Sequence, residues 1–132
     1  MASILKVDDL RGNTTAKTVT VTVGASATMS LEQGLAKAWV SMDAGQTVND
    51  SLNTASLTDN GSGDHTANWT NALSLATYAV ATFSRVTTTY AQVATPEGAF
   101  TTTTVTINTH QSNSTTKGDK TENGITAHGD LA

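Results

Sequence analysis

Threonine and valine alternate without a break through residues 18–23, and this segment constrains the fold more than any other. Because successive side chains of a strand point to opposite faces, the pattern predicts a strand with valines on one face and threonines on the other. The valine face is expected to pack either within the domain or against another subunit. Threonine also makes up 27 of the 132 residues, and β-branched side chains pack well on a pleated sheet. The composition therefore favours strands along the whole chain.

Short strand-like segments separated by polar turns follow along the chain. The segments predicted as strands are residues 37–42, 51–58, 65–70, 78–85, 86–94, 100–108 and 125–131, with turns at residues 59–64 and 95–98. Residues 30–33 fit a helix-capping box, so a helical turn competes there with a strand. Strands with turns roughly every eight to twelve residues are typical of an antiparallel sandwich or jelly roll. We therefore predict an all-β fold, an antiparallel β-sandwich or jelly-roll-like domain with a short N-terminal arm.

The chain length of 132 residues fits one domain with a short arm. We expect residues 1–30 to form an N-terminal docking arm with the first strand, and residues 31–132 to form the sandwich. Leu, Ile, Val and Phe together number only 24, so the core is thin for a domain of this size. Small scaffolds commonly bury further surface against copies of themselves. A homo-oligomer is therefore expected.

Composition and spacing also argue against several classes of function. A net charge of -4, with two Arg and no basic cluster, argues against a nucleic-acid partner. No apolar run is long enough for membrane insertion, and the lack of Cys excludes disulfides. The three His have no spaced partner that resembles a zinc motif, so neither a metal nor a cofactor is expected. No pair of carboxylates is placed for hydrolysis, so no catalytic residue and no enzymatic activity are expected.

Two polar segments are the candidates for exposed binding loops. The first is the turn at residues 59–64, whose glycines and Asn tolerate a positive φ. The second is the loop at residues 109–123, which is expected to be exposed and flexible because it has little to bury. His65 follows the turn and is interpreted as a surface histidine rather than a metal ligand or acid-base group. The candidate binding residues are Asp59, Asn60, Gly61, Asp64, His65, His110, Asn113 and Lys117.

The two tryptophans, Trp39 and Trp69, allow two interpretations. Each could stack against a sugar at the surface, because the indole ring is large, flat and amphipathic. Each also lies in a strand-like segment, where large aromatic side chains are usually well buried. The core interpretation is favoured for both.

Three stretches stand out, in this order: MASILKVD at residues 1–8, KAWV at residues 37–40 followed by ASLTDNGSGDHTANWT at residues 55–70, and GDLA at residues 129–132. Together they resemble short tail-fibre-like proteins of marine and cyanobacterial tailed phages. The match departs from the family after Val40, where Ser41 and Met42 replace the usual Asn-Phe, and at His65, where a Tyr is common. The resemblance implies a non-enzymatic virion structural protein with a β-sandwich fold, assembled as a homotrimer.

Further expectations about partners and location follow from the same resemblance. A tail-fibre or tail-tip adhesin would dock to other phage structural proteins and bind a host-surface glycan or protein. An alternative is a capsid decoration (cement) protein that stabilises the head through the major capsid protein. Either role places the chain in the virion, on the tail or the capsid surface. The expected virion-docking residues of the arm are Ile4, Leu5, Val7 and Leu10.

Overall fold

The computed structural model describes residues 9–10, 19–23, 27–86 and 92–132, and the chain divides between Leu35 and Ala36 into two units. In the first unit, strand β1 (Thr20–Val23) pairs antiparallel with β2 (Ala27–Ser30), as the alternating segment predicts for β1. A single helical turn, α1 (Leu31–Gly34), follows. The capping-box segment is therefore a helical turn rather than a strand. Val21 of β1 is 38% exposed.

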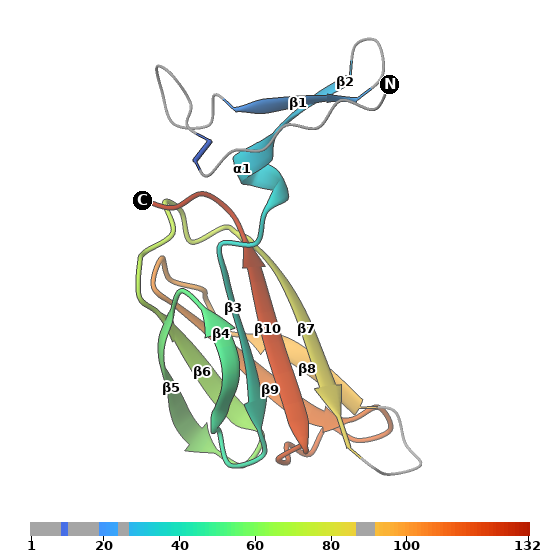
Figure 1. The fold of residues 1–132 in the computed structure, drawn as a ribbon. Coiled ribbons are helices and arrows are strands. Elements are labelled where there is room, and N and C mark those ends of the chain that lie inside the picture. The colour runs from blue at the N-terminus through green and yellow to red at the C-terminus, as the bar shows by residue number, and fades with distance from the viewer. Residues whose placement is uncertain (1–8, 11–18, 24–26, 87–91) are drawn as a thin grey trace. The chain divides into compact units, whose positions relative to one another are not determined.

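The second unit is a sandwich of two four-stranded antiparallel sheets, which confirms the predicted all-β sandwich (Figure 1). The first sheet has the strand order β4-β3-β10-β7, and the second has the order β5-β6-β9-β8. The strands of the first sheet are β3 (Ala38–Asp43), β4 (Val48–Leu52), β7 (Ala79–Arg85) and β10 (Glu122–His128). The strands of the second sheet are β5 (Thr54–Gly61), β6 (Asp64–Trp69), β8 (Gln92–Glu97) and β9 (Thr104–Gln111).

The core lies between the sheets and is built from alternate residues of their central strands. In β3, for example, Ala38, Val40 and Met42 are buried while the residues between them point to the opposite face. Two residues of the β6–β7 connection complete the core, and Tyr78 stacks on Phe100 with ring centroids 5.3 Å apart. The buried apolar residues are Ala38, Val40, Met42, Ala67, Trp69, Leu73, Tyr78, Val105, Ile107, Ile125 and Ala127.

The chain changes sheets between β4 and β5 at a single residue, Asn53. This residue has φ 55°, a left-handed conformation that Asn tolerates better than most side chains. Its side-chain oxygen accepts a hydrogen bond from the Asn71 backbone N–H at 2.7 Å, and its carbonyl accepts one from the Thr70 N–H at 2.9 Å. Hydrogen bonds to both the side chain and the backbone of Asn53 therefore fix the corner in place.

The turn predicted at residues 95–98 is wrong, because β8 continues through Pro96 to Glu97. Strand β8 lies at the edge of its sheet and pairs with β9 only, so a proline that cannot donate a hydrogen bond is tolerated there. The chain turns at Gly98, which has φ 68°. Residues 87–91 of the strand predicted at 86–94 lie outside the described residues.

Candidate functional site

The two predicted binding segments meet at one end of the sandwich. We call this the loop end, formed by the β5–β6 turn at residues 61–64 and the β9–β10 connection at residues 112–121. One carboxylate oxygen of Asp119 accepts a hydrogen bond from the Gly63 N–H at 2.6 Å, across 56 positions of sequence. The Thr109 N–H donates to the Gly63 carbonyl at 2.8 Å, and the Thr109 hydroxyl donates to the Gly118 carbonyl at 2.9 Å. The turn and the loop therefore form one hydrogen-bonded structure.

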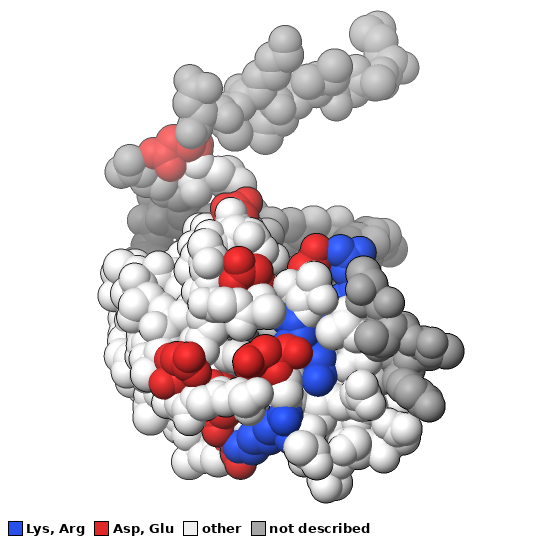
Figure 2. Space-filling model, turned by 90° about the horizontal axis from the view of Figure 1, so that it is seen from below, with Lys and Arg blue, Asp and Glu red and all other residues white. Residues whose placement is uncertain are grey.

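Lys117 makes a second connection between the loop and the sheet. Its Nζ lies 2.8 Å from Asp64 Oδ2 and 2.8 Å from Glu97 Oε2, so it bridges strands β6 and β8. The hydrogen bond from Lys117 lowers the pKa of Asp64, and the hydrogen bonds to Asp64 and Glu97 raise the pKa of Lys117. Figure 2 views the molecule from this end and shows basic side chains interspersed among acidic ones. Acidic side chains predominate at this end (Figure 2).

The polar residues of the turn are largely used to shape it. The Asp59 carboxylate accepts the Gly61 N–H at 2.8 Å, and the Asn60 amide donates to Asp64 Oδ1 at 3.1 Å and to the Thr66 hydroxyl at 2.8 Å. These bonds make the turn rigid. They also occupy side-chain groups that a ligand would otherwise use.

Gly63 allows the loop to approach the turn closely. It has φ 69°, and a Cβ built on it would lie 2.3 Å from the Gly118 N and 2.7 Å from the Thr109 carbonyl oxygen. Gly63 and Asp119 lie within the two predicted segments but were not among the individual candidate residues, and Glu97 lies outside both segments. No local pattern marks them, because their contacts join segments that are distant in sequence.

His65 is fully buried, so its interpretation as a surface histidine is wrong. It alternates with Ala67 and Trp69 on the core side of β6. Neither ring nitrogen has a hydrogen-bond partner within the part of the chain that the structure describes. Burial lowers the pKa of His65 and outweighs the opposing effect of the neighbouring carboxylates of Asp119, Asp59 and Asp64.

The loop predicted at residues 109–123 is only partly exposed. Thr109, Lys120 and Asn123 are buried, and the Asn123 side-chain oxygen accepts a hydrogen bond from the Ser84 hydroxyl at 2.8 Å. Asn113 is exposed, whereas His110 is half-buried in β9. The expectation of a wholly exposed segment is therefore wrong. Two of these buried polar side chains are hydrogen-bonded, Asn123 to Ser84 of β7 and Thr109 to the Gly118 carbonyl, which allows them to be buried.

Of the expected docking residues of the arm, the structure describes only Leu10, which is 56% exposed. Ile4, Leu5 and Val7 lie outside the described residues. The docking role of all four stays a prediction.

The two tryptophans lie in different environments. Trp69 is buried in the core, and its indole N–H donates to the Tyr78 hydroxyl at 3.4 Å, as the core interpretation predicted. Trp39 alternates with Ala38 and Val40 and therefore lies on the outer face of the first sheet, half-buried. The core interpretation is wrong for Trp39.

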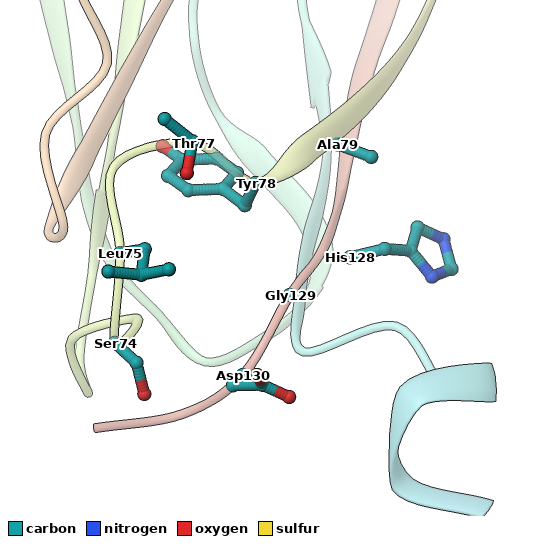
Figure 3. A pocket seen from close by; sticks show the side chains of 8 residues that line it. All are labelled: Ser74, Leu75, Thr77, Tyr78, Ala79, His128, Gly129 and Asp130. Atoms are coloured by element: carbon teal, nitrogen blue, oxygen red, sulfur yellow. The ribbon is translucent and has the colours of Figure 1, made fainter. Parts of the chain in front are cut away.

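A pocket of about 140 Å³ lies at the end of the sandwich away from the loop end, beside the β6–β7 connection (Figure 3). Its lining includes Ser74, His128 and Asp130, the residue types of a nucleophilic triad. However, the Ser74 hydroxyl donates a hydrogen bond to the Leu131 carbonyl at 2.6 Å. The imidazole of His128 points away from the Ser74 side chain (Figure 3). The three side chains are therefore not arranged for nucleophilic catalysis.

Comparison with known proteins finds no matching family model, no similar curated protein and no similar solved structure. The phage resemblance stays a prediction. Among the described residues, no group of three or more His, Cys, Asp or Glu side chains is placed to hold a metal ion. The same residues contain no helix long and apolar enough to cross a membrane.

Proposed function

We propose that this chain is a non-enzymatic structural protein of a phage virion, with the role of a tail-fibre or tail-tip adhesin. The observation that carries the proposal is the composition of the sandwich core. Every buried apolar residue in the described part of the chain lies between Ala38 and Ala127. The sandwich thus closes its core with its own strands, which leaves the unit Met1–Leu35 available to attach it to other virion proteins.

The rigidity of the loop end supports a role as a binding surface for host cells. Its turn and loop are held by hydrogen bonds to Asp119 and by the Lys117 ion pairs, so a binding surface there would lose little conformational freedom on contact. Polar groups that are still exposed, such as Asn113, could contact a host-surface glycan or protein. Single contacts of this kind are weak. A homotrimer would strengthen them by presenting several copies to one surface.

The thin core and the exposed apolar side chains support the proposed trimer. Leu131 in the second unit is 47% exposed, and Leu10, Val21 and Leu35 in the first unit are 56%, 38% and 55% exposed. We expect the full chain to elute as a trimer in size-exclusion chromatography with light scattering. Its melting temperature should rise with protein concentration, because association stabilises the folded state.

Adsorption measures the proposed role directly. Purified full-length protein should bind host cells and reduce the adsorption of the phage that carries it, in a dose-dependent way. The reference is the same phage and host with an unrelated β-sandwich protein added at equal concentration. Protein that neither binds the cells nor competes with the phage would overturn the adhesin proposal.

The location in the virion separates the adhesin from the capsid decoration protein. Gold-labelled antibody against the chain should mark the tail, and quantitative mass spectrometry should find far fewer copies than of the major capsid protein. Label spread over the head, at a copy number close to that of the major capsid protein, would instead identify a decoration protein. Absence of the chain from purified virions would overturn both roles.

A further inference from the structure

The outer face of the first sheet carries half-buried and exposed apolar side chains side by side. Trp39 of β3 lies directly opposite Leu52 of β4, which is 49% exposed. Phe83 of β7 is 51% exposed and points to the same face, because its neighbours Thr82 and Ser84 are less exposed and alternate with it. We call Trp39, Leu52 and Phe83, with the small residues between them, the aromatic face.

Phe83 is held flat against the sheet by a glycine. In the register of β10 and β7, Phe83 lies opposite Gly124. A Cβ added to Gly124 would overlap the Phe83 ring, so the ring occupies the space where any other residue would place its side chain. A glycine in a strand commonly marks such a close approach, and an aromatic cross-strand partner covers it. The ring is therefore fixed in orientation although it is half-exposed.

The residues between the two rings are small. Along the first sheet, Trp39 lies opposite Thr126, and Gly124 lies opposite both Ser41 and Phe83. Strands β3 and β7 are separated by β10 alone, so the backbones that carry the two rings are about 10 Å apart. The Phe83 ring covers Gly124 of β10 and so lies between these two strands. A ligand that touches Leu52, Trp39 and the Phe83 ring must span strands β4, β3 and β10, about 10 Å, which is further than one sugar ring.

A polar rim borders the aromatic face. Asp50 lies opposite Ser41 on the same face, and the next row of the sheet contains Asp43, Glu122 and Arg85. Glu122 and Arg85 form an ion pair, which leaves the rim with an excess of negative charge from the aspartates. Carboxylate oxygens accept several hydrogen bonds and have none to donate, so they suit a ligand rich in hydroxyl groups.

We propose that the aromatic face binds a neutral oligosaccharide chain, with Trp39 and Phe83 stacking against sugar rings and the rim carboxylates accepting hydrogen bonds from hydroxyls. An apolar surface with a few polar groups at its border is the usual composition of a small-molecule site. The flat rings match the C–H faces of sugars. The negative rim disfavours an anionic polysaccharide because like charges repel.

The same charge argument disfavours a second copy of the chain that is placed with its rim against this rim. Two copies in that arrangement would bring their aspartates together, which costs free energy unless cations intervene. A neutral ligand avoids that cost. The site also lies on strands rather than on the loop end, so its geometry does not depend on the contacts of residues 112–121.

Affinity electrophoresis of the full-length protein tests the proposal. The gels contain dextran, mannan, laminarin or starch as neutral polymers, and alginate or hyaluronate as anionic ones. We expect at least one neutral polymer to retard the protein and neither anionic polymer to do so. Acrylamide quenching of tryptophan fluorescence should fall on binding. Trp39 dominates this signal because Trp69 is only 4% exposed.

Variants then assign the binding to the aromatic face. Trp39→Ala should weaken binding about tenfold or more, and Trp39→Phe should restore part of it because a ring remains. Phe83→Ser should weaken it as well. The matched control is Leu75→Ala, which removes a more exposed apolar side chain from the β6–β7 connection, outside the aromatic face, and should bind normally. Melting temperatures of all variants identify any that fail to fold. If Trp39→Ala does not fold, Trp39→Phe takes its place, and its binding should be weaker than that of the natural chain.

Three outcomes would overturn the proposal. The first is the absence of retardation by every neutral polymer, and the second is binding that Trp39→Ala and Phe83→Ser leave unchanged. The third is a change of oligomeric state in Trp39→Ala, which would show that a second copy covers the face.

The inference names a ligand class for the proposed attachment role and rests on that role. The binding assay uses neither cells nor virions, so its failure leaves the virion role standing, and absence from virions leaves the measured binding standing.

Discussion

The imidazole of His65 is the buried side chain whose charge depends most directly on pH. It has no exposed surface and no hydrogen-bond partner in the described part of the chain, and burial lowers its pKa from the ordinary value of 6.5. The unfolded chain therefore takes up this proton at a higher pH than the folded chain. As pH falls below 6.5, the free energy of unfolding should decrease by at most about 1.4 kcal/mol per pH unit for this group, until the lower folded pKa is reached.

Urea denaturation between pH 8 and pH 5 measures this dependence. His65→Met keeps a side chain of similar size without a titratable group, and we expect it to flatten the slope between free energy and pH. The control Val105→Ala removes a buried side chain without a titratable group from the same sheet, so it should lower the stability at every pH and keep the slope of the natural chain. Equal slopes for His65→Met and the natural chain would contradict the prediction.

Gly63 and Gly98 form a matched pair for testing how tightly the loop end is packed. Both have nearly the same φ, 69° and 68°, but a Cβ on Gly63 would overlap the backbone of Gly118 whereas one on Gly98 meets nothing within 4 Å. Gly98→Ala should cost roughly 1–2 kcal/mol of unfolding free energy from backbone strain alone. Gly63→Ala should cost at least about 1 kcal/mol more, because the loop must move. Equal losses in chemical denaturation would show that the loop yields without cost.

The single residues that sequence analysis misplaced share one physical cause. The strands containing Trp39 and His65 were predicted, but the side of the sheet was inferred from residue type for Trp39 and from the neighbouring turn for His65. A strand has only two faces, and a shift of one residue exchanges them. In β3 the small residues Ala38 and Val40 face the core and Trp39 faces outward, the reverse of what side-chain size suggests. Residue type alone therefore could not place them.

At the scale of elements, Lys117 should control the local opening of the β9–β10 connection rather than global stability. Lys117→Met removes both ion pairs while keeping an aliphatic side chain, and an exposed ion pair contributes little to folding. We expect faster hydrogen exchange in residues 112–121 with little change in melting temperature. Loss of the Lys117 hydrogen bond should also raise the pKa of Asp64 toward its ordinary value.

Arg85→Met is the control for this experiment. It removes another exposed ion pair, that with Glu122, at the start of β10. It should leave the exchange of residues 112–121 close to that of the natural chain. Slow exchange in Lys117→Met would mean that the Asp119 hydrogen bonds alone hold the connection closed.

Elements with a regular pattern were predictable, whereas elements defined by distant contacts were not. Strands were predicted at residues 65–70, 78–85 and 100–108, where β6, β7 and β9 lie, and Val105 and Ile107 are both buried on one face of β9. The continuation of β8 through Pro96 depends on its position at the edge of a sheet, which local sequence does not reveal. Of the candidate site, the turn and the loop were identified, but their joining through Gly63 and Asp119 depends on tertiary pairing.

For the whole molecule, the self-contained core predicts that residues 36–132 fold without the first unit. All buried apolar residues of the described chain lie within that range. A chain of residues 36–132 should show a strand-rich circular dichroism spectrum and a cooperative thermal transition. If the first unit mediates assembly, the same chain should also be monomeric by light scattering. A shortened chain without a cooperative transition would show that the sandwich needs residues 1–35 to fold.

The two kinds of contact at the loop end give the molecule a different response to dilute and concentrated salt. The Lys117 bridge is exposed, and at about 1 M ionic strength the screening length shrinks to about 3 Å. The Asp119 hydrogen bond to the Gly63 N–H is partly buried and is screened much less. In brine the connection would therefore be held mainly at Asp119, with the Lys117 side free to adapt. In fresh water both points would hold it, so the salinity of the medium sets how far this surface can adjust to what it meets.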